Sequence, residues 1–192
     1  MTARRLIVIG ASSGGLEALR SIVARLPGDL PAAICAVIHT SPDSPGTLAS
    51  ALQRTAGPSV MVAGHGTPLR EGHLYLPPPD RHVLVTPGQL QLSRGPRENR
   101  FRPAIDPLFR TAAQVYGPAS IGVILTGDLH DGTAGLWTIK RLGGLTVAQD
   151  PREALFPSMP DSAIRHVEVD HTARLSEIPE LLVRLVMRHP TM

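Results

Sequence analysis

The sequence Leu6-Ile7-Val8-Ile9-Gly10-Ala11-Ser12-Ser13-Gly14-Gly15, near the start of the chain, decides the fold. Its first four residues are apolar and mostly β-branched, which predicts a buried strand, and the small residues after them allow a sharp turn. Apolar residues then recur at a helical spacing at Leu16, Leu19, Val23 and Leu26. A strand that leads directly into a helix is typical of an α/β fold, and it leaves the first helical N–H groups free at the turn.

The two serines of this turn, Ser12 and Ser13, have three roles open to them. An N-cap is the commonest role for a serine that precedes a helix. The turn also resembles the phosphate-binding loop of short-chain dehydrogenases. The third role is a nucleophile at the edge of the sheet, which needs a base and an oxyanion hole from elsewhere in the chain.

The length and the apolar runs indicate one domain. At 192 residues, of which 42% are hydrophobic, the chain can bury a sizeable core but leaves little room for a second domain. Apolar runs at residues 32–38, 121–125 and 145–148 predict further strands between helical patterns. We therefore expect a three-layer α/β fold, with a mostly parallel sheet and helices on both faces.

The remaining totals narrow the class of protein. No apolar run approaches the length of a membrane span, which predicts no membrane insertion. The one cysteine, Cys35, has no partner for an internal disulfide, as is typical of a cytoplasmic protein. Arginine supplies nearly all the positive charge and suits carboxylate or phosphate partners. With no run of Lys and Arg and with 3% aromatic residues, the sequence predicts no nucleic-acid binding.

Alternation with period two from position 74 predicts an antiparallel addition to the main sheet. Apolar residues alternate at Leu74 and Leu76, then at Val83 and Val85, and again after a Thr-Pro-Gly-Gln turn. We expect these segments to form a hairpin or small meander that joins the sheet.

Three polar side chains are expected at the carboxyl ends of parallel strands. Ser12 follows the first strand, His39 follows the run at 32–38, and Asp131 lies in the turn after the run at 121–125. Because the carboxyl ends of parallel strands meet at one edge of a sheet, we expect these side chains to lie together. Hydroxyl, imidazole and carboxylate are the nucleophile, base and orienting acid of serine hydrolases. Their order differs from the Ser, Asp, His order of the α/β-hydrolases.

Several spaced motifs carry a resemblance to a known family. They are Ile9-Gly10-Ala11-Ser12-Ser13-Gly14-Gly15, His39 at a strand end, Leu125-Thr126-Gly127 with Asp131-Gly132, Asn99-Arg100-Phe101-Arg102-Pro103 with Asp106, and Phe156 with Met159-Pro160. In these motifs, and over nearly its whole length, the chain resembles the catalytic domain of the chemotaxis methylesterase CheB.

The resemblance implies hydrolysis of γ-glutamyl methyl esters on the cytoplasmic helices of chemoreceptors, with glutamine deamidation as a related activity. It implies Ser12 as the nucleophile, His39 as the base and Asp131 as the acid, and it implies no metal and no organic cofactor. The oxyanion donors that it implies are the backbone N–H groups of Ser13 and Asp128.

The partner and the domain organisation follow from the same resemblance. Because receptor helices are rich in glutamate, we expect Arg100 and Arg102 to bind substrate, with Arg94 and Arg97 beside them. The first predicted strand begins a few residues after Met1, so we expect a single catalytic domain over residues 1–192 without a receiver domain. The partner is then a methylated chemoreceptor or another methylated protein.

Departures from the family pattern keep alternatives open. Asp128 and Leu129 stand where the family usually has methionine and glycine. A carboxylate beside a developing oxyanion opposes catalysis unless it is paired or turned away, so a catalytically weakened binding module stays open. His130, beside two aspartates, also permits a metal site. A nucleotide-binding oxidoreductase is favoured only by the opening turn, and the chain lacks the Tyr-x-x-x-Lys pattern of such dehydrogenases.

Overall fold

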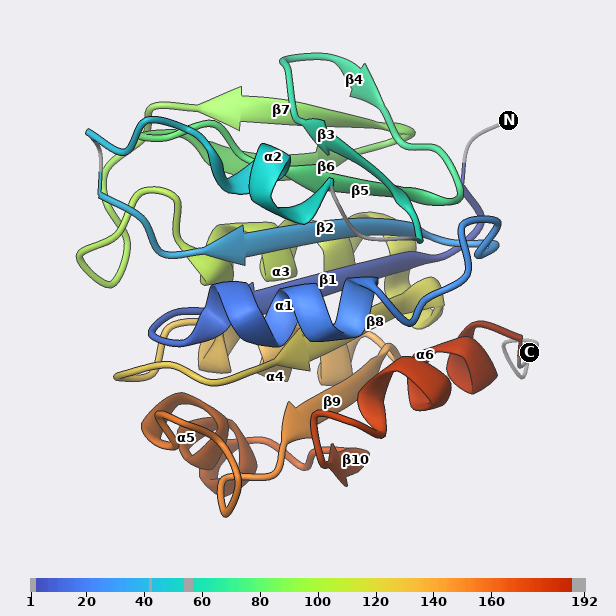
Figure 1. Ribbon diagram of the computed structural model, residues 1–192, viewed down its shortest axis with the longest axis vertical. Helices are drawn as coiled ribbons and strands as arrows, with labels where there is room; N and C mark the ends of the chain where they lie inside the picture. The colour runs from blue at the N-terminus through green and yellow to red at the C-terminus, as the bar shows by residue number, and fades with distance from the viewer. Residues whose placement is uncertain (1–2, 42, 54–56, 188–192) are drawn as a thin grey trace.

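A seven-stranded parallel sheet forms the centre of the molecule (Figure 1). The computed structural model describes residues 3–41, 43–53 and 57–187, so both ends of the predicted domain over residues 1–192 lie outside the described residues. The strand order is β10-β9-β8-β1-β2-β5-β3. These strands are β1 (Leu6–Ala11), β2 (Ala33–Ile38), β3 (Ser59–Val62), β5 (His73–Leu76), β8 (Ser120–Ile124), β9 (Leu145–Gln149) and β10 (His171–Ala173).

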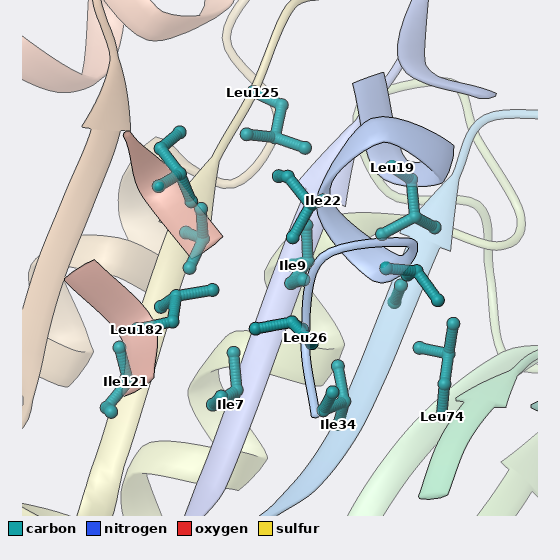
Figure 2. Close-up of a cluster of buried hydrophobic side chains, with 14 of the residues drawn as sticks. Ile7, Ile9, Leu19, Ile22, Leu26, Ile34, Leu74, Ile121, Leu125 and Leu182 are labelled. Atoms are coloured by element: carbon teal, nitrogen blue, oxygen red, sulfur yellow. The ribbon is translucent and has the colours of Figure 1, made fainter. Parts of the chain in front are cut away.

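Helices cover both faces of this sheet, so the predicted three-layer α/β fold is confirmed. One face packs against α1 and α6, and the opposite face packs against α3, α4 and α5 (Figure 1). Figure 2 shows the first of these cores, in which Ile7 and Ile9 of β1 and Ile22 of α1 belong to one cluster of buried side chains. No helix in the described part of the chain is long and apolar enough to cross a membrane. The helices are α1 (Gly15–Val23), α2 (Leu48–Leu52), α3 (Ile105–Tyr116), α4 (Thr133–Arg141), α5 (Ser158–His166) and α6 (Ile178–Met187), with a 3-10 turn η1 (Gly117–Ala119).

The predicted antiparallel hairpin exists, but its place was wrong. Strands β6 (His82–Thr86) and β7 (Gln89–Ser93) pair antiparallel and form a separate three-stranded sheet with β4 (Thr67–Pro68). Leu74 and Leu76 belong instead to β5, which pairs parallel with β2 and β3 in the main sheet. The period-two interpretation failed here because Tyr75, between the two leucines, is also buried. A strand buried on both faces carries no alternation of burial.

The register of the central strands brings their ends to one level. Ala11, the last residue of β1, pairs with Ile38 of β2, and Gly10 pairs with Ile124 of β8. The residues that directly follow β1 and β2, and the turn that follows β8, therefore emerge at the same edge of the sheet. This edge is where open α/β sheets bind their ligands.

Candidate active site

Ser12, His39 and Asp131 come together at this edge of the sheet. Ser12 directly follows β1, His39 directly follows β2, and Asp131 lies in the turn between β8 and α4. The Nδ1 atom of His39 lies 3.0 Å from Ser12 Oγ, and its Nε2 atom lies 2.7 Å from Asp131 Oδ2. The structure thus joins the three predicted residues in one hydrogen-bonded chain, with the imidazole between the hydroxyl and the carboxylate.

The imidazole of His39 presents Nδ1 to the serine and Nε2 to the acid. In the serine protease template the two nitrogens are exchanged, with Nε2 toward the serine. The chemistry is the same in both orientations, because each partner still meets one ring nitrogen. A hydrogen on Nε2, donated to Asp131, leaves the lone pair of Nδ1 directed at the Ser12 hydroxyl, as a general base requires.

Asp131 is held by donors from three parts of the chain. Its side chain is fully buried. Besides His39, the backbone amide of Ile105 donates to Oδ2 at 2.7 Å, while Asn99 Nδ2 and the Asp106 amide donate to Oδ1 at 2.7 and 3.2 Å. Ile105 and Asp106 open α3, so the carboxylate sits at the positive end of that helix, where N–H groups lack helical partners.

These contacts keep Asp131 ionised. Burial alone would raise its pKa, but the hydrogen bonds from His39, the Ile105 amide and Asn99, together with the charge of His39, hold the pKa below its ordinary value. The neighbouring Asp106 shifts in the opposite direction, because burial and the charge of Asp131 raise its pKa. The side chain of Asn99 lies between the two carboxyl groups and donates to both, at 2.7 Å to Asp131 and 2.8 Å to Asp106.

The turn between β1 and α1 does not use its serines as helix caps. Gly14 is the N-cap residue of α1, with φ of 74°, and no side chain caps the helix. A left-handed conformation of this kind favours glycine. The hydroxyls of Ser12 and Ser13 are directed elsewhere, to His39 and to Asp128.

A second turn, directly after β8, packs against the nucleophile turn. The Ser12 amide donates to the carbonyl of Thr126 at 3.0 Å. A Cβ atom at Gly127 would lie 2.7 Å from Ser12 Cβ, so this approach requires glycine. Hydrogen bonds connect Phe156 to the second turn. Its amide donates to Thr126 Oγ1 and its carbonyl accepts from the Gly127 amide, each at 2.9 Å.

The two departures from the family pattern are both accommodated locally. Ser13 Oγ donates to Asp128 Oδ2 at 2.7 Å, so the additional carboxylate is paired. Leu129 adopts φ of 67°, the left-handed conformation that glycine adopts freely, at a cost of about 1 kcal/mol or more. No acceptor in the described part of the chain takes the amide hydrogen of Ser13 or of Asp128. Neither amide is therefore committed to a hydrogen bond within these residues.

The metal site that the sequence permits at His130 lacks a set of ligands in the described part of the chain. Among residues 3–41, 43–53 and 57–187, no three His, Cys, Asp or Glu side chains gather as possible metal ligands. Asp131, the adjacent acid in sequence, is directed to His39 instead.

An open cleft of about 460 Å³ leads to the serine. Ser12, Ser13, His39 and Asp128 form one part of its lining, and Phe101 with three arginines forms the other part. The three arginines are Arg97, Arg100 and Arg102.

The arginines of the cleft differ in their bonding. Arg102 donates to Asp80 Oδ1 at 2.9 Å and to the carbonyl of Gly95 at 2.9 Å, so its guanidinium already holds neighbouring loops. Arg97 and Arg100 are exposed and form no ion pair with any described acidic side chain. These two cations are therefore available to an anionic ligand.

Asn99 and Phe101 are the residues whose contacts the sequence analysis missed. Asn99 bonds the acid, and the ring of Phe101 stacks on the imidazole of His39 with centroids 3.5 Å apart and an angle of 5° between the planes. Both belong to the quoted motif at residues 99–103, which was the available signal. The motif by itself does not say that it lies against the triad.

Comparisons with known proteins agree on one family. The family model described as CheB methylesterase matches residues 7–182. The crystal structure of the Thermotoga maritima CheB methylesterase catalytic domain is similar, with a TM-score of 0.90 and 34% sequence identity, and the match covers 94% of this chain and 98% of that chain.

Relatives in sequence carry names of the same kind. A Leptospira interrogans protein is 40% identical over 180 residues, 93% of each chain, and its name provisionally assigns it the activities of a protein-glutamate methylesterase and protein-glutamine glutaminase. A Pyrococcus horikoshii protein with these activities in its name is 38% identical over 188 residues, which are 96% of this chain and 51% of the relative. The chain thus matches nearly all of the first relative and about half of the second.

Proposed function

The chain belongs to the CheB methylesterase family, and we propose that it removes methyl esters from glutamate side chains of a protein through Ser12, His39 and Asp131. The observation that carries this proposal is the hydrogen-bonded chain from hydroxyl to imidazole to carboxylate beside an open cleft. These are the groups of a nucleophile, its base and the acid that orients the base. The nucleotide-binding oxidoreductase is set aside, because it rested on the opening turn alone.

In the first half of the reaction, Ser12 attacks the ester. His39 Nδ1 takes the hydroxyl proton as Ser12 Oγ forms a bond to the ester carbonyl carbon. Asp131, hydrogen-bonded to Nε2, stabilises the imidazolium that results. The tetrahedral intermediate then breaks its bond to the methoxy oxygen, which takes the proton from His39 and leaves as methanol.

In the second half, water hydrolyses the acyl-enzyme. His39 takes a proton from water, the hydroxide oxygen bonds to the acyl carbon, and Ser12 Oγ leaves and recovers its proton. The product is a glutamate carboxylate. A glutamine side chain would follow the same steps with ammonia as the leaving group, which is the second activity in the relatives' names.

The oxyanion of the intermediate is proposed to bind the amides of Ser13 and Asp128. Both belong to the turns that meet at Ser12, and both lack an acceptor in the described part of the chain. Donors of this kind stabilise negative charge where it develops, and removing one typically lowers kcat by about 10²- to 10³-fold.

The proposed substrate is a methylated chemoreceptor helix or another methylated protein. Arg97 and Arg100 line the cleft without an ion pair to the described acidic side chains, so they would attract the acidic residues of a glutamate-rich segment. Arg102 supports this wall of the cleft through its bond to Asp80. We also propose that the chain acts as a single catalytic domain in the cytoplasm, where the helices of such receptors lie.

Methanol release from a methylated chemoreceptor tests the proposal. We expect Ser12→Ala to lower kcat by about 10⁴ or more, which is roughly 5.5 kcal/mol of barrier. Ser13→Ala is the matched control, because its hydroxyl bonds Asp128 and not His39, and it should lower kcat by less than about tenfold.

Two results would contradict this assignment. Equal losses in the two variants would move the nucleophile away from Ser12. A wild-type chain that binds the methylated receptor and releases no methanol would favour the catalytically weakened binding module.

A further inference from the structure

Residues 98–101 form a tight turn that contacts Asp131 and His39, the acid end of the triad. Glu98 and Phe101 exchange both of their backbone hydrogen bonds, at 3.1 and 2.8 Å. Between them, Asn99 and Arg100 adopt φ of 49° and 75°. Two successive residues with positive φ are the mark of a type I′ turn, which commonly has asparagine first and glycine second. The arginine at the second position makes the turn strained, so other contacts must hold it in this conformation.

Two side chains of the turn contact two members of the triad. Asn99 Nδ2 donates one hydrogen to Asp131 Oδ1, on the oxygen that His39 does not use, and the other to Asp106 Oδ2. The ring of Phe101 lies flat on the imidazole of His39. One short turn thus fixes the plane of the carboxylate at its first central residue and the plane of the imidazole at its last residue.

An ion pair connects this turn to the helix that carries Asp106. The Nη2 atom of Arg110, in α3, donates to both carboxylate oxygens of Glu98, at 2.8 and 2.7 Å. Hydrogen bonds between charged groups are stronger than those between neutral groups, so this pair ties Glu98 to α3. The backbone amides at the start of the same helix donate to Asp131, so α3 supports the acid directly and also anchors the turn.

We propose that the turn of residues 98–101 is a positioning device for the triad, in which Asn99 orients Asp131 and Phe101 orients His39. This inference rests on the proposed function of the triad, and it adds positioning residues outside it. Asn99 acts through Asp131 and does not line the cleft at Ser12. Its loss should therefore slow the chemistry and leave substrate binding nearly unchanged.

The test uses the full chain and two readouts. The first is labelling of Ser12 by a fluorophosphonate, in which Ser12 Oγ bonds to phosphorus, His39 takes the proton and fluoride leaves. This readout needs an activated serine and does not depend on which ester is the natural substrate. We expect Asn99→Ala to slow labelling by about 10- to 100-fold, the range found when outer partners of catalytic ligands are removed. With a methylated receptor as substrate, kcat should fall by a similar factor while KM stays within about twofold.

Thr146→Val is the matched control for stability. Thr146 is buried near the start of β9, away from the carboxyl ends of the strands where the triad lies, and its hydroxyl donates to Asp170 at 2.8 Å. Its loss should lower the Tm as Asn99→Ala does and leave the labelling rate within about twofold of wild type. Labelling of Asn99→Ala at the wild-type rate, or equal slowing in Thr146→Val, would overturn the proposal.

Phe101 provides a second route to the same answer. We expect Phe101→Leu to slow labelling about tenfold, because leucine has no flat face for the imidazole, and Phe101→Tyr to restore it to within about twofold. If Asn99→Ala fails to fold, the two Phe101 variants test the proposal instead. Equal labelling rates for Phe101→Leu and Phe101→Tyr would refute a positioning role for the turn. Strong labelling of Ser12 without release of methanol would instead reject the methylesterase proposal. The labelling rates of the variants would still test the positioning role of the turn.

Discussion

The acid end of the triad and its serine end are built in different ways. Asp131 is fully buried, and its two oxygens accept hydrogen bonds from His39, Asn99 and the first amides of α3. Ser12 borders an open cleft, and its hydroxyl contacts His39 alone among the described side chains. The carboxylate of Asp128, which could disturb the chemistry of Ser12, is exposed, and Ser13 is its one hydrogen-bond partner among the described residues.

This difference indicates which substitutions affect folding and which affect only chemistry. Each oxygen of Asp131 satisfies buried donors, so changing it leaves those donors unpaired in the folded state. The hydroxyl of Ser12 bonds His39 Nδ1 at the edge of the cleft, where a water molecule can take the place of the hydroxyl. The acid end thus serves both the fold and the reaction, while the serine end serves the reaction.

Asp131→Asn should have the largest combined effect. The amide places an NH₂ group against either the Ile105 amide or Asn99, so that a donor faces a donor, and it no longer selects the tautomer of His39. We expect kcat to fall by about 10⁴-fold, as in the serine protease template, and the free energy of unfolding to fall by about 1–3 kcal/mol. Methanol release and urea unfolding measure the two effects.

Ser12→Ala sharpens the contrast. It should match the loss in kcat and change the free energy of unfolding by less than about 0.5 kcal/mol. Equal stabilities for the Asp131→Asn and Ser12→Ala variants would remove the distinction between the two ends.

Low pH should reduce the stabilisation of the fold that ionised Asp131 provides. Because the pKa of Asp131 in the folded chain lies below its ordinary value of about 3.9, its ionised form stabilises the fold at every pH above that value. This contribution declines as the pH falls through the folded pKa. The difference in free energy of unfolding between wild type and Asp131→Asn should therefore stay constant from neutral pH to about 5 and shrink below about 4. A difference that grows toward acid would mean that Asp131 is protonated in the folded state.

The positions of the three triad residues were easier to predict from the sequence than the groups that donate hydrogen bonds to Asp131. Ser12 and His39 each follow a strand directly, and Asp131 follows one by a short turn, so strand prediction places all three at one edge. The donors to Asp131 depend instead on how α3 meets that edge. The contact of Asn99 also needs a turn with two positive φ values, and an Asn-Arg pair is a weaker signal for such a turn than Asn-Gly.

The fold shows the same limit. The parallel strands and both helical layers were predicted, because long apolar runs and helical spacing are local properties of the sequence. The segment at Leu74 and Leu76 was expected to pair antiparallel within the hairpin, and it instead pairs parallel with β2 and β3, partners that are set by contacts distant in sequence.

Asp128→Asn tests the serine end with a smaller effect. The asparagine keeps an acceptor for the hydroxyl of Ser13 and removes a negative charge near the proposed oxyanion. At a partly exposed site such a charge opposes the transition state by about 1 kcal/mol, so kcat should rise by about two- to tenfold. Ser13→Ala leaves the carboxylate without its donor and should lower kcat by a few-fold only while Asp128 is present. If Ser13→Ala lowers kcat equally in the Asp128→Asn background, the pairing is not what limits the rate.

Arg100→Gly should have the smallest effect, and in opposite directions on stability and docking. Glycine adopts the φ of 75° at this position without strain, so the free energy of unfolding should rise by about 0.5–1 kcal/mol. The same change removes a cation from the cleft, so kcat/KM for an acidic methylated receptor should fall by about two- to fivefold, and its dependence on ionic strength should weaken. Arg100→Gln removes the charge and keeps the strain, so it should reproduce the loss in kcat/KM without the gain in stability. A stabilised Arg100→Gly variant with unchanged kcat/KM would mean that the strained arginine does not serve docking, and that the serine end takes its substrate without charge from this turn.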